Sequence, residues 1–254
     1  MRTPSYRSLR VWQRNRDVFF KLWRTEVPGF FAEPLFILLA MGVGLGTYVA
    51  LSDNTDYLEF IAPGIVAAYA MFSASAECTY GSFVRMKFQR TFDAIIATPL
   101  NMEDVVAGEI FWGATRSLLT SVAILIVIAA FGLVNSWWAL IVLPIAVLSG
   151  LMFSSIALFF TSLAPSIYSF NYYFTLFITP MFFFSGVFFP LDAFSPTVRR
   201  LCRVSPLTPA ADLTRALVSG QPGEGSWWGL AIILGLIVIF FPLALIMMRR
   251  RLLK

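Results

Sequence analysis

The chain of 254 residues contains no histidine, and only 13% of its residues are charged. Histidine is the usual general base near neutral pH and the commonest metal ligand in proteins. Its absence argues against metal-dependent or histidine-dependent catalysis, so we expect a protein that is not an enzyme. The charged fraction is about half of the roughly 25% found in soluble domains, and 58% of the residues are hydrophobic. These proportions predict an integral membrane protein.

Two nucleotide-binding patterns are also missing. The sequence has no G-x-x-x-x-G-K-[ST] loop and no dinucleotide-binding glycine motif after a strand. We therefore expect this chain to bind no cofactor, and any nucleotide to bind another subunit. No nucleic-acid-binding module is visible, and the net charge of +5 indicates membrane topology and lipid contact. Cys78 and Cys202 fall on different predicted segments, so no disulfide framework is predicted.

Long apolar runs are what the sequence has in abundance. A helix of about 20 apolar residues crosses the roughly 30 Å hydrocarbon core of a bilayer. The sequence predicts an all-α integral membrane fold with six transmembrane helices. Their expected ranges are 30–51, 60–83, 108–131, 137–163, 170–189 and 227–248. In the fourth range, a face of small residues that includes Ser149 and Gly150 is typical of close helix packing.

Residues 1–28 precede the first apolar run and predict a cytoplasmic amphipathic helix at the membrane interface. Apolar side chains such as Trp12 and Phe19 share one helical face, and cations such as Arg14 lie opposite. We expect Pro28 and Gly29 to break this helix before the chain enters the bilayer. The transmembrane domain would then cover residues 29–251.

Basic residues gather before the first span, in the central loop and in the tail RRRLLK. Cations mark cytoplasmic segments, so this distribution places both termini in the cytoplasm, with an even number of spans. Between the last two spans, prolines divide the chain into short amphipathic pieces. We expect these pieces to be short external re-entrant helices.

The loop RMKFQRTFDAIIATPLNMED, between the second and third spans, is charged throughout yet keeps an apolar group beside an acid. A short helix ending at a Thr-Pro step would present them on one face. We predict a docking surface for a soluble partner, and the alternative is a merely interfacial helix. The predicted docking residues are Phe92, Asp93, Ile95, Ile96, Thr98 and Pro99. Asn101 is a plausible N-cap of the next helix.

Two opposite charges lie inside apolar runs, Glu77 in the second span and Arg116 in the third. A charge left unpaired in the bilayer costs several kcal/mol. We predict that these side chains pair with each other or line a polar cavity. In the alternative, Arg116 reaches the membrane surface with its long side chain and Glu77 faces water alone.

The fifth apolar run ends in the aromatic segment FFFSGVFFP. Its phenylalanines could close the outer end of a path across the membrane, with a glycine that permits a sharp turn. Apolar bulk that faces lipid is the alternative. The predicted outer-gate residues are Phe184, Gly186, Phe188, Phe189 and Pro190.

Three stretches resemble the membrane permeases of ABC-2 (type-2) ATP-binding-cassette exporters. They are SAECTYGSFVRMKFQRTFDAIIATPLNMEDVVAGEIFWGATRSLL, TPMFFFSGVFFPLDAFSP and SPLTPAADLTRAL. The resemblance implies an interfacial helix, six spans, a cytoplasmic coupling helix and two external gate helices. It further implies a second copy of the chain, two ATPase subunits that bind ATP and Mg, and an amphipathic glycolipid substrate in contact with membrane lipid.

Within that family, the stretch ECTYGSFVRMKFQRTFDAIIATPL is most similar to nodulation-factor permeases, which are associated with lipo-oligosaccharide export. Many relatives place a histidine after Pro-Leu-Thr, whereas this chain has Pro209, so no role of that imidazole carries over. A drug-efflux permease and a membrane scaffold or binding protein that transports nothing are the alternatives. A neighbouring gene that encodes a phosphate-binding loop would favour the exporter.

Overall fold

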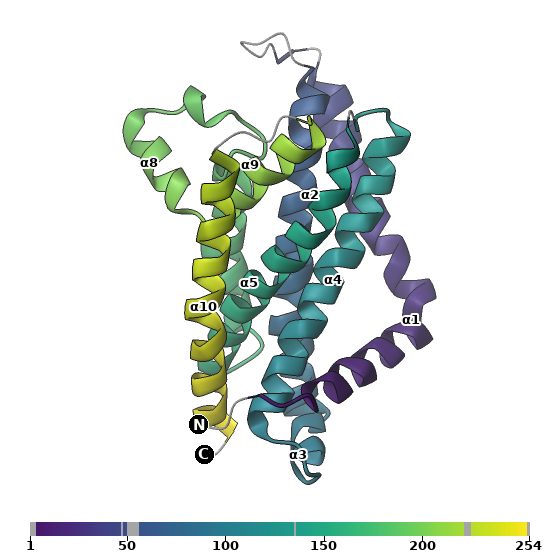
Figure 1. The fold of residues 1–254 in the computed structure, drawn as a ribbon, viewed down its shortest axis with the longest axis vertical. Helices are drawn as coiled ribbons and strands as arrows, with labels where there is room; N and C mark the ends of the chain where they lie inside the picture. Colours follow the sequence, from purple (N-terminus) through teal and green to yellow (C-terminus); the bar gives the residue numbers. More distant parts are fainter. Residues whose placement is uncertain (1–3, 47, 50–55, 135, 221–224, 253–254) are drawn as a thin grey trace.

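The structure is a computed structural model that describes residues 4–46, 48–49, 56–134, 136–220 and 225–252. Within these residues all regular elements are helical and no strand is present, which confirms the all-α prediction. Five helical runs are long and apolar enough to cross a membrane. They are Ser8–Gly44, Tyr57–Phe88, Met102–Ala130, Trp137–Leu163 and Trp228–Leu252. Figure 1 shows most of this helix bundle upright, with short helices at both ends.

The first run consists of α1 (Ser8–Ile37) and the π-helical segment η1 (Leu38–Gly44). The expected break at Pro28 and Gly29 is wrong, because α1 continues through both residues. Proline lacks the amide hydrogen of a helical turn and kinks a helix without ending it. In Figure 1, α1 accordingly runs obliquely at first and then bends upward along the bundle.

The second run lies at the centre of the molecule. It begins with α2 (Tyr57–Ala76), which the Asp56 carboxylate caps by accepting a hydrogen bond from the Leu58 amide. It continues through two π-helical segments, η2 (Glu77–Gly81) and η3 (Val84–Phe88). All residues from 61 to 71 are buried, because α2 packs against α4, α5 and α9.

The third and fourth runs pack closely on each other. They are α4 (Met102–Ala130) and the pair η4 (Trp137–Ile141) and α5 (Val142–Leu163). A Cβ atom placed on Gly150 of α5 would lie 2.6 Å from the Ser117 Cβ and 2.8 Å from the Ala114 Cα of α4. The predicted small-residue face therefore exists, and it lets the two helices approach closely.

The predicted fifth span is a shorter helix than expected. It consists of α6 (Ser169–Tyr173), η5 (Phe174–Ile178) and α7 (Thr179–Phe184), which follow one another without a break. At 1.5 Å per residue this helix measures about 24 Å, and it ends before Phe189 because Gly186 adopts a left-handed φ of 77°. The count of six spans is thus not confirmed.

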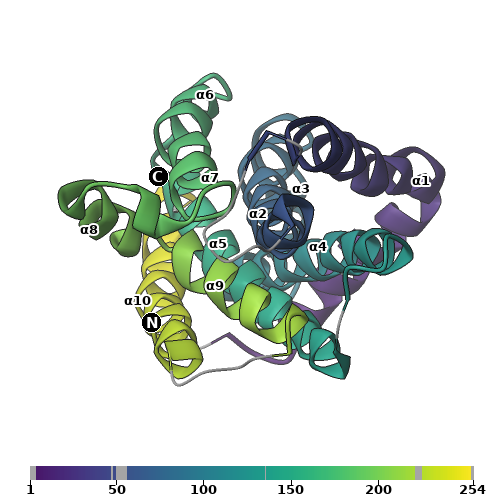
Figure 2. The same ribbon diagram turned by 90° about the horizontal axis from the view of Figure 1, so that it is seen from above.

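Three further helices follow, after the 3-10 turn η6 (Leu191–Ala193): α8 (Pro196–Val204), α9 (Leu207–Val218) and α10 (Gly225–Leu252). Helix α8 is largely exposed, whereas α9 is largely buried and lies across one end of the bundle (Figure 2). The short helix α3 (Thr91–Ile96) lies at the opposite end (Figure 1).

The close approach of α4 and α5 predicts the effect of one added methyl group. Gly150→Ala should lower the free energy of unfolding by about 1–3 kcal/mol, the usual cost of overpacking, because the atoms it meets include the α4 backbone. The matched control is Gly235→Ala on α10, where a Cβ meets nothing within 4 Å. Thermal unfolding in detergent measures both variants, and an unchanged midpoint for Gly150→Ala would contradict this packing.

Candidate functional site

A fully buried carboxylate, that of Glu109 on α4, lies at the centre of the candidate site. Its Oε2 accepts hydrogen bonds from Arg85 Nε at 3.0 Å and Nη2 at 2.5 Å, and from Ser82 Oγ at 2.6 Å. Its Oε1 accepts one from Asn15 Nδ2 on α1 at 2.9 Å. A buried charge needs such partners, because desolvation costs several kcal/mol per ion. Glu109 therefore joins α1, the end of the second run and α4.

Arg85 extends the site toward Glu77, whose Oε1 lies 2.7 Å from Arg85 Nη1. The two residues belong to η3 and η2, and a π-helical turn holds more residues than an α-helical turn. Glu77 and Arg85 are eight positions apart. The π-helical turns change the register of the helix, and the two side chains meet on one side of it. Single π turns inside α-helices frequently occur at functional sites.

Arg116 of α4 lies on the other side of Glu77. Its Nε is 3.4 Å from Glu77 Oε2, so the two residues that the sequence analysis paired are in contact. Its shorter ion pair, at 2.8 Å, is with Glu26 of α1, and its guanidinium also lies over the Phe30 ring, 4.8 Å from the centroid. We call the five charged residues the ion-pair network. They are Glu26, Arg116, Glu77, Arg85 and Glu109.

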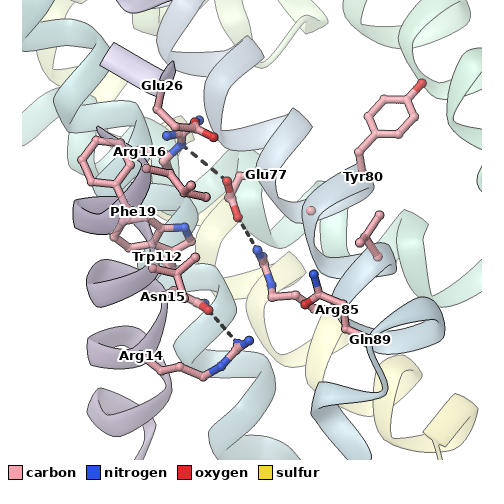
Figure 3. Close-up of a pocket in the computed structure, with 14 residues that line it drawn as sticks. Arg14, Asn15, Phe19, Glu26, Glu77, Tyr80, Arg85, Gln89, Trp112 and Arg116 are labelled. Carbon is pink, nitrogen blue, oxygen red and sulfur yellow. Dashed lines mark hydrogen bonds and ion pairs between the residues drawn. The ribbon is translucent and has the colours of Figure 1, made fainter. Parts of the chain in front are cut away.

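Figure 3 shows a cavity between α1, the second run and α4, and four members of the network line it: Glu26, Glu77, Arg85 and Arg116. The cavity measures about 370 Å³, and Trp112 and Tyr80 contribute aromatic surface to it. Arg14 also lines it and donates a hydrogen bond at 3.0 Å to the same Asn15 side chain that binds Glu109. The cavity is thus lined by charged and polar groups together with aromatic and aliphatic ones, and we call it the network cavity.

Helix α3, the predicted docking segment, differs from expectation in one residue. Phe92 is fully buried and belongs to the hydrophobic core of this chain, so it cannot be an anchor that inserts into a partner. A helix of six residues has few contacts, and the buried ring attaches it to the bundle. Asp93, Thr98 and Pro99 are exposed, and Ile95 and Ile96 are half-buried.

The chain on both sides of α3 fixes its position. Arg90 precedes it with a left-handed φ of 50°, rare for a residue with a side chain. After it, Asn101 caps α4, as predicted, and it forms a reciprocal capping box with Asp104. A cavity of about 730 Å³ lies beside this turn, lined by Ile96, Thr98, Pro99, Glu103 and Arg249 among others.

The predicted outer gate separates into two groups. Phe188 is buried and packs edge-to-face on Phe182, with ring centroids 4.8 Å apart. Phe184 and Phe189 are exposed, and Pro190 is half-buried. The aromatic residues therefore do not form one cluster, because the sharp turn at Gly186 directs the chain onto α2.

Arg215 of α9 holds this turn and was not predicted. Its Nη2 donates to the Gly186 carbonyl at 2.7 Å and its Nε to the Phe60 carbonyl at 3.3 Å. Burial lowers the pKa of the Arg215 guanidinium from its ordinary value, against the effect of nearby Asp212. Arg215 and Gly186 are separated in the chain by a proline-rich region, and this separation concealed the contact.

Sequence reasoning found Glu77 and Arg116 but missed the other members of the network. Arg85 was assigned to the central loop, whereas it belongs to the second helical run. Glu109 lies in the third predicted span and was assigned no role. The signal that marks them is a lone charge within a turn or two of the end of an apolar run.

Comparison with known proteins assigns a family to this arrangement. The family described as "ABC-2 type transporter" matches residues 7–218. The chain belongs to this family. It is 37% identical over 247 residues to Nodulation protein J of Rhizobium leguminosarum bv. viciae, which covers 97% of this chain and 95% of the relative. Nodulation protein J of Rhizobium meliloti (strain 1021) is 36% identical over 242 residues, covering 95% and 92%.

A more distant relative carries a transport description. Inner membrane transport permease YadH of Escherichia coli (strain K12) is 24% identical over 200 residues, covering 78% of this chain and 77% of the relative. Family membership and the apolar helical runs show that this ABC-2 protein is a membrane transport subunit.

The network predicts a large effect of removing one charge from this ABC-2 protein. Glu109→Gln should lower the free energy of unfolding by about 3–5 kcal/mol, because it leaves part of the Arg85 charge buried without compensation. The matched control is Asp17→Asn, which removes an exposed pair with Arg16 and should cost less than about 1 kcal/mol. Denaturation in mixed micelles measures both, and equal effects would contradict the structural role of Glu109.

Proposed function

We propose that this chain is the permease subunit of an ABC exporter that moves a lipo-oligosaccharide or a related glycolipid outward across the bacterial inner membrane. The observation that carries the proposal is the similarity to Nodulation protein J over nearly the whole chain. It agrees with the resemblance of the central stretch to permeases associated with lipo-oligosaccharide export. ATP and Mg then bind to a separate ATPase subunit, and this chain needs no cofactor.

The topology that this function requires has six crossings and cytoplasmic termini. Both ends of the described chain meet the beginning of α4, which supports an even number of crossings. The Ser5 amide donates to Asp104 Oδ1 at 2.6 Å, and Arg249 of α10 pairs with Glu103 at 2.6 Å. The helix from residue 169 to 184, extended by the apolar turn to Pro190, supplies the sixth crossing in this proposal.

The ATPase docks on α3 and on the turn that follows it. This surface consists of the exposed and half-buried side chains Asp93, Ile95, Ile96, Thr98 and Pro99. It lies at the same end of the molecule as the Arg249 pair, on the side where cations are expected to mark the cytoplasm. In this proposal, Phe92 transmits a movement of α3 to the core, and η3 transmits it to the ion-pair network.

Two copies of the chain and two ATPase subunits complete the exporter in this proposal. The chain exposes many large apolar side chains along its helices, among them Phe36, Val238 and Ile239. Part of this surface faces lipid and part faces the second copy. The Ser185 to Pro190 turn, held by Arg215, forms the outer end of the path and acts as its gate.

The docking surface predicts a variant that folds but does not couple. Asp93→Ala with Ile96→Ala should reduce co-purification of the ATPase at least tenfold, because interface energy concentrates in a few anchors of about 2 kcal/mol each. Phe92 is left unchanged, since its burial would confound the result. The matched control is Asp192→Ala with Leu201→Ala, two exposed residues in or beside α8, which lies at the other end of the molecule from α3 (Figure 1). Normal recovery of the ATPase with the first variant would refute this docking surface.

Export itself is tested with the purified permease and its ATPase in proteoliposomes. We expect ATP-dependent movement of a fluorescent lipo-oligosaccharide across the bilayer, and none with an ATPase variant that binds but does not hydrolyse ATP. Movement of a lipophilic drug instead would identify the drug-efflux alternative. Complex formation without movement of either compound would identify a scaffold.

A further inference from the structure

A second cavity, of about 440 Å³, lies beside the network cavity and deeper along the spans. Its walls come from α1, the middle of α2, α4 and η5, and it shares Glu26 and Arg116 with the network cavity. The volume falls within the roughly 300–1,000 Å³ typical of ligand pockets. We call it the deep cavity.

Several polar side chains line the deep cavity, although it lies among apolar helices. Glu33 of α1 and Tyr69 of α2 both line it, and Glu33 is exposed. Across the cavity, Thr120 Oγ1 donates to Ser73 Oγ at 2.9 Å. Among the described residues no cation lies within ion-pair distance of Glu33. An unpaired carboxylate on a membrane-spanning helix marks a substrate path.

Aromatic rings supply the rest of the wall. Phe72 of α2 and Phe174 of η5 are stacked, with centroids 6.4 Å apart and an interplanar angle of 20°. Phe30 lies under the Arg116 guanidinium, and all three rings line the deep cavity. Flat rings beside carboxylates and hydroxyls are the groups that recognise sugars, because a sugar ring presents C–H bonds on its faces and hydroxyl donors on its rim.

The charges of the deep cavity distinguish a neutral ligand from an anionic one. Glu26 and Glu33 supply two carboxylates, and Arg116 supplies one guanidinium that is already paired with Glu26. A phosphate or other anion would therefore meet uncompensated negative charge. Hydroxyl and amide N–H groups can instead donate directly to both carboxylates.

We propose that the deep cavity binds the neutral sugar portion of an amphipathic glycolipid. In this assignment Glu33 and Glu26 accept hydrogen bonds from the sugar, and Phe72 and Phe174 pack against its face. The assignment rests on the proposed export function and deepens it, since it names the part of the substrate that this cavity holds.

Gly29 offers a way to fill the deep cavity without disturbing the fold. It lines the cavity, and a Cβ atom placed on it would meet nothing within 4 Å. A large side chain there enters open space. Gly29→Phe should therefore obstruct the cavity, whereas Gly29→Ala keeps it open and adds a residue with a higher helix propensity.

The test is photo-crosslinking of the full chain in lipid nanodiscs. The probe is an alkyl maltoside with a diazirine on its terminal sugar, and mass spectrometry locates the modified residues. We expect modification within residues 25–33 and 69–76. Gly29→Phe should reduce the yield at least tenfold, and Gly29→Ala should retain it. Glu33→Gln should raise the half-saturating probe concentration about tenfold, since a hydrogen bond to a charged group is among the stronger ones, and Asp17→Asn should leave it unchanged.

Three results would overturn the assignment. The first is an undiminished yield in both Gly29→Phe and Glu33→Gln. The second is equal or stronger modification of the same residues by an alkyl phosphate that carries the diazirine on its headgroup. The third is equal modification by an alkyl diazirine without a headgroup, which would identify a site for lipid tails.

The crosslinking assay requires neither ATPase nor transport, so its failure is distinct from failure of the proposed function. Normal export by Gly29→Phe in proteoliposomes would overturn the role of the deep cavity and leave the exporter intact. The expected crosslinks without any ATP-driven movement by the wild type would overturn the exporter and leave the sugar site.

Discussion

The Glu109 carboxylate imposes the main constraint on this molecule. A charge without solvent contact must be compensated within the protein, and here the donors come from two segments, α1 and the end of the second run, that are distant in sequence from each other and from Glu109. Arg85 serves Glu109 and Glu77 together, so the end of the second helical run cannot move without breaking an ion pair. The position of α1 against α4, and hence the existence of both cavities, depends on this compensation.

Close packing between small residues supplies the second part of the framework. Gly108 of α4 lies against Val11 and the Ser8 carbonyl of α1, where a Cβ would come within 2.7 Å of that oxygen. Gly150 permits the close approach of α4 and α5 in the same way. In a bilayer, helices associate through such contacts and through polar groups more than through the hydrophobic effect. The helices are therefore close at Gly108 and Gly150.

The sequence was a good guide to elements and a poorer guide to contacts. Apolar runs predicted the five long helical runs, and the capping residue Asn101 predicted the start of α4. The length of the helix after residue 169 was overestimated, because hydropathy does not register the turn at Gly186. The bend of α1 was mistaken for an end, since a proline kink and a helix terminus share the same residue signal.

The candidate site could be predicted only in part, for a related reason. The charges within apolar runs indicated Glu77 and Arg116. The shorter ion pair of Arg116 is with Glu26, however, and that pairing depends on how α1 crosses α4. Phe92 showed the opposite error. A phenylalanine in a charged loop suggests an exposed anchor, and only the tertiary structure shows that its ring belongs to the core.

The bend of α1 near Pro28 gives the pair of Arg116 and Glu26 a further significance. Both residues line the network cavity and the deep cavity, so the pair forms part of the wall of each. A displacement of this pair therefore changes the walls of the network cavity and of the deep cavity at the same time. A pivot of α1 about its proline would thus alter the network cavity and the deep cavity together.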